Sequence, residues 1–243
     1  MCAGMCGDVR ARCEHGQVIV VAEGPSAAGK STWANTFPAQ HVIPETGAIE
    51  VPTSMSDVEH AAFWNNVNCD RWSDAVGVEE STALAVCDTD PLKLHYDYCL
   101  ARIGAANWER FDCGVAEAQA SITEQRLGIA DLVVVHLPDD LTLARQRDSD
   151  RSRRRRNFEL HRRLAEPLRD WYLALDRLEP GRVRWGFPSE HLPHVHRNRF
   201  GQELFVAWMA DLPRRTARPS RQTAGGAEPT PRGTGALREA FGN

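Results

Sequence analysis

The feature that most constrains this chain is a glycine-rich segment that follows a strand-like apolar run. The run is VIVVA at 18–22, and the segment after it, Gly24-Pro-Ser-Ala-Ala-Gly-Lys-Ser-Thr32, fits the pattern G-x-x-x-x-G-K-[ST] in full. Glycines let a backbone approach a phosphate group without Cβ clashes, and a helix that starts there adds its positive dipole end. The segment therefore predicts a phosphate-binding loop between a buried strand and a helix.

We expect this loop to hold ATP together with Mg²⁺. Lys30 would neutralise the β- and γ-phosphates, and the Ser31 hydroxyl would ligate the metal. The 29 basic residues include only two lysines, Lys30 and Lys93, which argues against a lysine at this position by chance. The loop residues expected to contact the nucleotide are Gly24, Ser26, Ala27, Ala28, Gly29, Lys30, Ser31 and Thr32.

The two ends of the chain differ in composition from its centre. Residues 1–16 have no periodic apolar pattern, and 213–243 are rich in Pro, Gly, Thr and Arg, so both are expected to be disordered tails. Residues 17–212 remain as one domain. No apolar run approaches the ~20 residues of a membrane helix, and the first residues lack a secretory signal. We therefore expect a cytoplasmic protein without a membrane contact, whose seven cysteines are reduced.

Short apolar runs alternate with longer stretches of helical spacing, which predicts an open α/β sheet with helices on both faces. The expected strands are 18–22, 41–44, 83–87, 131–136 and 182–187. The expected helices are 30–36, 57–75, 92–103, 115–128, 140–148, 157–178 and 201–212. Several of the runs are apolar throughout, as in strands that are buried on both faces of a parallel sheet.

The phosphate loop alone does not name a reaction. A guanine-reading N-K-x-D motif is absent, because neither lysine follows an asparagine, and no L-S-G-G-Q-like stretch is present. A single domain of this length is also small for a motor. Of the enzyme classes that use such a loop, this leaves a small kinase that moves the γ-phosphoryl group of ATP to a bound acceptor.

Such a kinase needs one carboxylate near the acceptor hydroxyl and another on the Mg²⁺ side. Ligands of an open parallel sheet lie beyond the carboxyl ends of its strands. Glu45 and Asp88 each follow an expected strand, and Asp90 comes two residues later. We expect Glu45 to be the base, Asp88 to lie on the metal side and Asp90 to contact the substrate; a solvated strand-end acid is the alternative for each.

Arginines are concentrated between residues 145 and 163, where nine stand against three acids. Guanidinium groups on a mobile segment can close over ATP and stabilise charge on the transferring group. We expect Arg147 and Arg151 to be catalytic and Arg153 to bind the nucleotide. A solvated helix face and a nucleic-acid site are the alternatives, and the net charge of −4 argues against nucleic acid.

The order of these features resembles the deoxynucleoside kinase and thymidylate kinase group of P-loop kinases over about residues 17–190. The resemblance implies a P-loop NTPase-type three-layer sandwich with a five-stranded parallel sheet and an Arg-rich lid at about 145–160. It also implies that Glu45 faces a sugar hydroxyl and that the 57–75 helix faces the acceptor. Candidate acceptor contacts on that helix are Asn68 and Arg71, with Trp64 or Trp72 stacking; a core role for the aromatics is the alternative.

One departure from the family concerns the acceptor. Deoxynucleoside kinases usually carry an acid–Arg–Ser step after the third strand, whereas this chain has Asp88-Thr-Asp-Pro91, with Lys93 nearby as a replacement for the arginine. The acceptor is therefore expected to be a nucleoside or a nucleotide, with an antibiotic-like hydroxyl compound as the alternative.

Residues after the last strand are expected near the adenine. His191, His194 and His196 lie there, with Asn198 and Arg199 as candidate contacts to the base or ribose. From another functional class, a nucleotide-binding regulatory module that binds RNA through its arginines is an alternative reading, and an ATPase that only hydrolyses is a third. A homodimer is compatible with all three.

Overall fold

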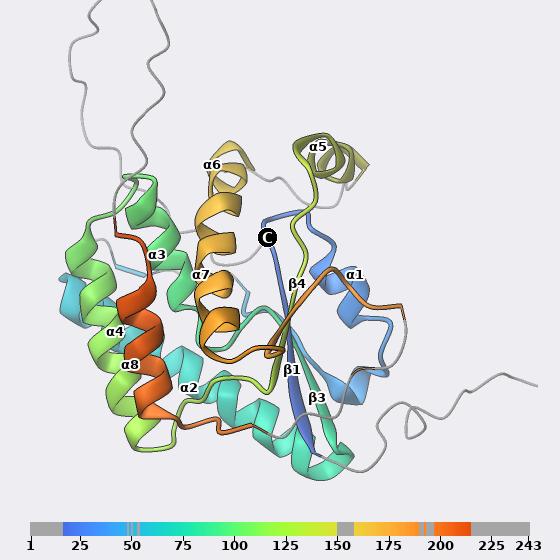
Figure 1. Cartoon of the computed structure of the whole chain (residues 1–243), viewed down its shortest axis with the longest axis horizontal. Helices are drawn as coiled ribbons and strands as arrows, with labels where there is room; N and C mark the ends of the chain where they lie inside the picture. The colour runs from blue at the N-terminus through green and yellow to red at the C-terminus, as the bar shows by residue number, and fades with distance from the viewer. Residues whose placement is uncertain are drawn as a thin grey trace, which may run out of the picture.

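The computed structural model describes residues 17–47, 49, 51–52, 54–149, 158–189, 192 and 197–214. Residues 1–16, the expected C-terminal tail from 215 onward and the segment 150–157 lie outside them. The described chain is an α/β fold around a five-stranded sheet whose strands are all parallel, in the order β2-β3-β1-β4-β5 (Figure 1). The strands are β1 (Val18–Glu23), β2 (Val42–Ile43), β3 (Leu84–Asp88), β4 (Leu132–Val135) and β5 (Val183–Trp185). The predicted α/β class is confirmed, and each strand lies within one residue or two of its expected range.

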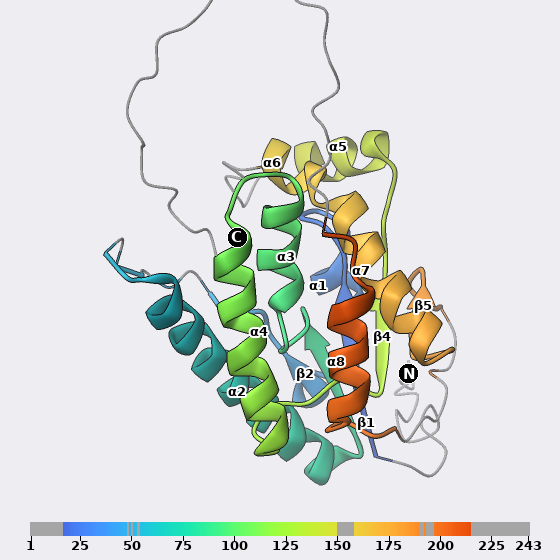
Figure 2. The ribbon, with the colours of Figure 1, turned by 60° about the vertical axis from the view of Figure 1, so that its left-hand side comes forward.

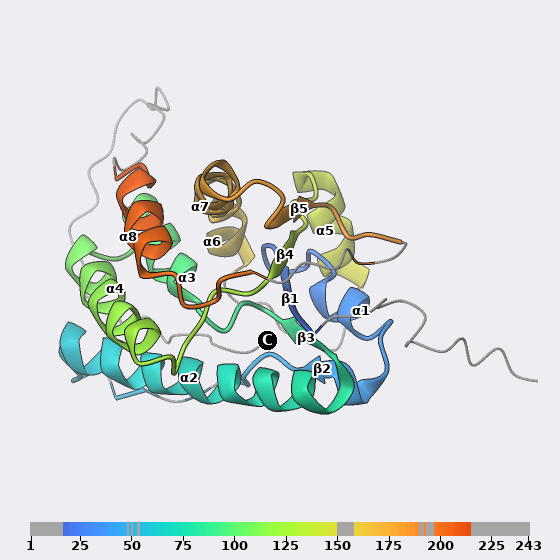
Figure 3. The same cartoon turned by 60° about the horizontal axis from the view of Figure 1, so that its bottom comes forward.

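The helices cover the two faces of the sheet unequally (Figures 2 and 3). One face carries α1 (Lys30–Ala34), whose Trp33 packs on Val18 and Val20 of β1. The other face carries a much larger core, built from the opposite side of the same strand. Its helices are α2 (Asp57–Thr82), α3 (Leu94–Arg102), α4 (Trp108–Thr123), α7 (Ala165–Leu178) and α8 (Gln202–Asp211). The alternation of side chains along β1 separates the two cores.

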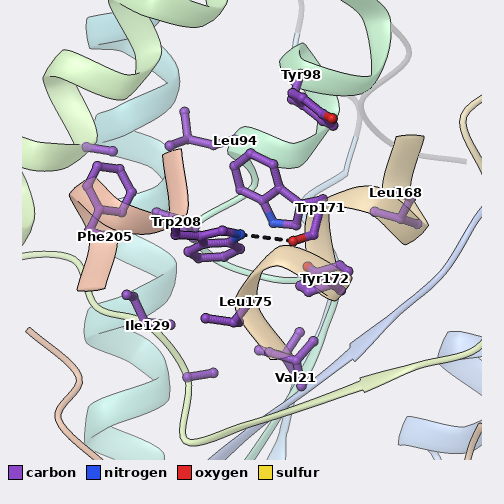
Figure 4. Close-up of a cluster of buried hydrophobic side chains, with 14 of the residues drawn as sticks. Val21, Leu94, Tyr98, Ile129, Leu168, Trp171, Tyr172, Leu175, Phe205 and Trp208 are labelled. Atoms are coloured by element: carbon purple, nitrogen blue, oxygen red, sulfur yellow. Dashed lines mark hydrogen bonds between the residues drawn. The ribbon is translucent and has the colours of Figure 1, made fainter. Parts of the chain in front are cut away.

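Aromatic side chains fill the larger core. Trp171 of α7 and Trp208 of α8 pack with ring centroids 4.7 Å apart, and the Trp208 indole donates to the Trp171 carbonyl at 2.9 Å (Figure 4). Tyr98 of α3 packs on Trp171 from the other side. These contacts fix α3, α7 and α8 relative to one another, because each buried ring removes a large apolar area from water.

The helix boundaries differ from the expected ones where capping and tertiary packing decide them. Helix α2 begins at a capping box formed by Ser56 and Glu59, and continues to Thr82 instead of ending at 75. Helix α4 begins seven residues earlier than expected, because the Asn107 side chain accepts from the Arg110 amide and caps it. The expected 157–178 helix is divided into α6 (Phe158–Arg163) and α7.

Helices α5 (Asp140–Ser149) and α6 lie beyond the carboxyl ends of the strands (Figures 1 and 2). An ion pair at 3.0 Å joins Arg162 of α6 to Asp140 of α5. Across the described residues, no helix combines the length and the apolar character that crossing a membrane requires.

Candidate functional site

The predicted site residues follow neighbouring strands at one edge of the sheet. In the register of β1 and β3, Ala22 lies opposite Asp88, so the loop after β1 begins beside the carboxylate that ends β3. Glu45 follows β2, the next strand outward. Because the strands are parallel, their carboxyl ends share this edge, where ligands of open α/β sheets bind.

The glycine loop, residues 24–32, has a conformation that requires its glycines. A Cβ on Gly24 would lie 2.3 Å from the carbonyl oxygen of His136, so no side chain fits there. Gly29 has a φ of 86° as the residue before α1, in the left-handed region that favours glycine. Ala27 also has a positive φ, 71°, which costs about 1–3 kcal/mol for such a residue. The chain holds a strained backbone at this loop.

The loop surface is accessible along most of its length. Lys30 folds back over it, and its Nζ donates to the carbonyl oxygens of Gly24 at 2.8 Å and Pro25 at 3.3 Å. Gly24 and Ala28 are buried and Thr32 is exposed, whereas the other loop residues expected to contact nucleotide are half-buried: Ser26, Ala27, Gly29, Lys30 and Ser31. The lysine charge is thus held at the mouth of an open loop.

Asp88 ends β3 beside this loop, because its register partner is Ala22, two residues before Gly24. Burial raises the pKa of Asp88, and the nearby Ser31 side chain and the Lys30 charge only partly oppose that effect. One carboxylate oxygen, Oδ1, is buried and has no hydrogen-bond partner among the described residues. A carboxylate with an unused oxygen beside a hydroxyl is a donor set that suits Mg²⁺.

Within the described ranges, no cluster of three or more His, Cys, Asp or Glu side chains could hold a metal by itself. Mg²⁺ does not need one, since it usually keeps several waters and binds through one or two carboxylates plus substrate phosphates. Ser31 and Asp88 therefore fit a metal that arrives with a nucleotide, and do not form an all-protein cage.

Glu45 is paired with the other lysine of the chain. The Lys93 Nζ lies 3.2 Å from Glu45 Oε1. Burial favours the neutral form of Glu45, but the charges of Lys93, Lys30 and Arg71 outweigh it and lower its pKa. Lys93 has a φ of 45° as the residue before α3, another strained position. Glu45 is thus held ionised beside two lysines, which makes it a good hydrogen-bond acceptor and a weak base.

Arg71 reaches the same edge of the sheet from α2. It is only 6% exposed, and its Nη2 donates to the carbonyl oxygens of Pro44, Asp88 and Thr89 at 3.0–3.3 Å. Its Nε and Nη1 have no hydrogen-bond partner in the described part of the chain. Buried polar groups without partners are rare in native proteins, so these two donors indicate a ligand or water site.

A pocket opens beside Lys93, between α2, α3 and α4. Trp64 and Asn68 of α2 both line it. The Trp64 indole donates to His60 Nε2 at 2.9 Å, and the Asn68 amide donates to the Leu92 carbonyl at 3.2 Å. The complete lining is Ala61, Trp64, Asn65, Asn68, Leu92, Lys93, Leu94, Tyr96, Asp97, Gly114 and Ala118. Two of the expected acceptor contacts thus line one pocket, and Lys93 of the same pocket pairs with Glu45.

Trp72 and Asp90 have surroundings that differ from the expected ones. Trp72 is 2% exposed and packs so closely on Gly128 that a Cβ there would lie 2.3 Å from the indole. Asp90 is buried, and its two oxygens accept from the Leu92 amide at 3.0 Å and the Tyr172 hydroxyl at 3.1 Å. Trp72 is therefore a core residue, and Asp90 holds the loop after β3 instead of presenting itself to a substrate.

Two polar residues at this edge carried no expectation from the sequence. Thr89 has a φ of 78°, unusual for a β-branched residue, and its buried hydroxyl has no partner among the described residues. Glu23 ends β1 and is 2% exposed, with both carboxylate oxygens engaged. The sequence feature that could have identified Glu23 is its position as an acid directly after five apolar residues and directly before Gly24.

The arginines expected to form a lid are only partly within the described residues. Arg147 lies in α5, but its side chain is outside the description. Arg151 and Arg153 fall in the segment 150–157 and are outside it entirely. Their expected roles stay predictions.

Arg199 is at the opposite end of the sheet from the glycine loop. Its guanidinium donates to Asp131, the residue before β4, and to Glu79 near the end of α2. Asn198 accepts there as well, from Arg182 before β5. Contacts from Arg199 or Asn198 to an adenine are therefore wrong, because both residues lie where strands begin.

The loop after β5 does approach α1. Phe187 stacks on Trp33 with centroids 5.2 Å apart, and the Trp33 indole donates to the Pro188 carbonyl at 3.2 Å. Three histidines of the next segment were expected near the adenine. They are outside the described residues: His191, His194 and His196.

Comparisons with known proteins identify no relative of this chain. No protein-family model matches the chain, and no curated protein matches it in sequence.

Proposed function

We propose that the chain is an ATP- and Mg²⁺-dependent small-molecule kinase of the P-loop NTPase type, similar to the deoxynucleoside kinase and thymidylate kinase group. The observation that carries the proposal is the position of Asp88, opposite Ala22 in the β1–β3 register and so beside the strained glycine loop that holds Lys30 and Ser31. A phosphate-binding loop, a hydroxyl and a strand-end carboxylate at this spacing are the parts that P-loop enzymes use around a metal-bound triphosphate.

On the donor side, the glycine loop would hold the β- and γ-phosphates. Lys30 would exchange its two carbonyl contacts for phosphate oxygens, and Ser31 and Asp88 would hold Mg²⁺ directly or through water. The metal would neutralise charge on the transferring group. Catalysis of this kind comes mostly from positioning and charge, because phosphoryl transfer needs little covalent participation by the protein.

On the acceptor side, the pocket beside Lys93 would bind the compound that receives the phosphoryl group. Glu45 pairs with Lys93, which lines that pocket, and is held ionised by the Lys93 and Lys30 charges, so it can accept a hydrogen bond from an acceptor hydroxyl. Lys93 and Arg71 bring positive charge to the position where the deoxynucleoside kinases that the sequence resembles carry an arginine after the third strand. They support transfer to a bound acceptor over simple hydrolysis.

The arginine-rich segment would complete the enzyme as a lid. Helices α5 and α6 flank the segment 150–157 beyond the carboxyl ends of the strands, which is the side of the proposed ATP site (Figure 1). Arginines delivered from there, among them Arg147, Arg151 and Arg153, would stabilise charge on the transferred group.

A screen of ATP consumption tests the proposal. Wild-type protein is incubated with Mg·ATP and single candidates from three classes: nucleosides, nucleotides and hydroxylated antibiotics, with products identified by mass. A phosphorylated product from one class is expected. Phosphate release that no acceptor changes would instead support an ATPase, and RNA binding with a steep salt dependence and no transfer would support the regulatory module.

The same assay tests the acceptor side. Glu45→Gln removes the charge but keeps the shape, so we expect turnover to fall ~100-fold or more while ATP affinity stays within about threefold. Equal losses in turnover and ATP affinity would remove Glu45 from the acceptor side.

A further inference from the structure

Glu23 joins the two loops of the proposed catalytic site through one buried carboxylate. Its Oε1 accepts from the amide of Gly24, the first residue of the glycine loop, at 2.9 Å. Its Oε2 accepts from the amide of Asp90, in the loop after β3, at 3.1 Å. Asp88 ends β3 two residues before Asp90, so Glu23 links the first residue of the glycine loop to the loop that directly follows the candidate metal ligand.

The far side of this link is anchored in the core. The Asp90 carboxylate accepts from the Tyr172 hydroxyl of α7 at 3.1 Å and from the Leu92 amide at 3.0 Å. The Thr89 amide donates to the Ala22 carbonyl at 3.0 Å, which extends the β1–β3 pairing by one residue. The loop after β3 is therefore held from both sides, and Glu23 is the contact that ties it to the glycine loop.

This position is costly for an acid. Glu23 is 2% exposed and lies close to a second buried carboxyl, Asp90, whose pKa burial raises to about 6, helped by the Glu23 charge. Charge-assisted hydrogen bonds to two amides, with the His95 Nε2 3.5 Å away, offset part of this cost. An apolar residue would satisfy packing at the end of β1, but it could not accept from two loops at once.

We propose that Glu23 is a positioning residue that sets the distance between the glycine loop and Asp88, and so the geometry of the metal–triphosphate site. The inference rests on the proposed function, since it concerns the same site. It assigns no contact between Glu23 and the nucleotide. It requires that loss of the Glu23–Asp90 bond weakens the contribution of Mg²⁺ to ATP binding and leaves binding of the metal-free nucleotide almost unchanged.

Glu23→Gln breaks this link between the two loops. The amide oxygen can accept from only one of the Gly24 and Asp90 amides, and the amide nitrogen, which is a donor, cannot pair with the other. The matched control is Glu79→Gln, the same substitution at a residue that is 3% exposed and pairs with Arg199 at the opposite end of the sheet. Both variants lose one buried negative charge, so a general loss of stability affects both.

Calorimetry measures the ATP affinity of each protein in Mg²⁺ and in EDTA. The quantity compared between variants is the affinity in Mg²⁺ divided by the affinity in EDTA. Loss of a group that orients a metal ligand typically costs ~10–100-fold in metal affinity, so the ratio should fall by about tenfold in Glu23→Gln. ATP affinity in EDTA should stay within about twofold, and Glu79→Gln should keep the wild-type ratio. An unchanged ratio in Glu23→Gln, or the same fall in both variants, would overturn the assignment.

A second pair of variants serves if Glu23→Gln does not fold. Tyr172→Phe removes the hydroxyl that holds Asp90, and Tyr98→Phe removes a hydroxyl from the same aromatic cluster whose partner is the distant Pro213 carbonyl. The ratio should fall in the first variant and not in the second; equal ratios in both would overturn the proposal. Wild-type protein that binds no ATP under either condition would contradict the proposed function itself, a result distinct from a normal wild type with an unaffected Glu23→Gln.

Discussion

The two ends of the sheet differ in how far their buried charged and polar groups are paired. Where the strands begin, Arg199 is shared between the carboxylates of Asp131 and Glu79, and Asp131 also accepts from the Ile19 amide at 2.8 Å. Arg182 is fully buried there and donates to backbone carbonyls and a carboxylate. Where the strands end, several buried polar atoms have no partner among the described residues: Arg71 Nε and Nη1, Asp88 Oδ1, Thr89 Oγ1 and His95 Nδ1. Where the strands begin, Arg197 Nε also lacks one.

The backbone shows the same difference. Non-glycine residues with positive φ accompany the carboxyl ends at Ala27, Thr89 and Lys93. At the other end, Ala83 and Gln125 have a positive φ in the ordinary setting of a helix C-terminus. Satisfied charges and relaxed backbone stabilise a fold, whereas unsatisfied groups and strain concentrate at functional sites. The comparison assigns stability to one end of the sheet and ligand binding to the other.

The largest expected effect is a loss of stability at the strand beginnings. Arg199→Ala leaves two buried carboxylates without their shared cation, so the free energy of unfolding should fall by about 3–5 kcal/mol. Chemical denaturation measures it, and calorimetry at a temperature where the variant is folded should give wild-type ATP affinity. A weakened ATP affinity in the folded variant would contradict the assignment of ligand binding to the carboxyl ends of the strands alone.

Asp88→Asn tests the carboxyl ends in the opposite sense. Turnover should fall ~100-fold or more, because the variant loses a charged ligand of the metal. The free energy of unfolding should stay constant or rise, since burial raises the pKa of Asp88 and the native protein pays to keep it ionised. A large loss of stability at neutral pH would show that Asp88 is a structural charge like Asp131.

The sequence predicts a site residue well when its role depends on neighbours in the sequence, and poorly when it depends on residues far along the chain. The glycine loop, Glu45 and Asp88 are placed by motif and by the end of an apolar run, and the parallel sheet then brings them to one edge. Trp72 and Asp90 depend on Gly128 and Tyr172, which are far away in sequence, so helical spacing alone could not distinguish a core contact from a cleft contact. Arg199 was misplaced because its partners come from α2 and β4.

A smaller effect concerns acid sensitivity at the carboxyl ends. Burial lowers the pKa of His95 to about 4 from 6.5, despite the nearby Glu23 charge. Between these values the unfolded chain binds a proton that the folded protein does not, so stability falls as pH decreases from about 6.5 to about 4. We expect His95 to account for roughly 1–2 kcal/mol of the loss between pH 7 and pH 5. Urea denaturation of His95→Gln at both values should show a shallower loss; an unchanged pH slope would contradict it.

The most direct test of the account is a calorimetric titration of Mg·ATP into wild-type protein and into Lys30→Ala. The wild type should bind one ATP per chain, and the variant should lose most of that affinity. The melting temperature should change little, because the hydrogen bonds that Lys30 makes within the described residues go to loop carbonyls. Absence of binding by the wild type, or equal affinity in both proteins, would contradict the claim that the carboxyl ends of this sheet hold a triphosphate.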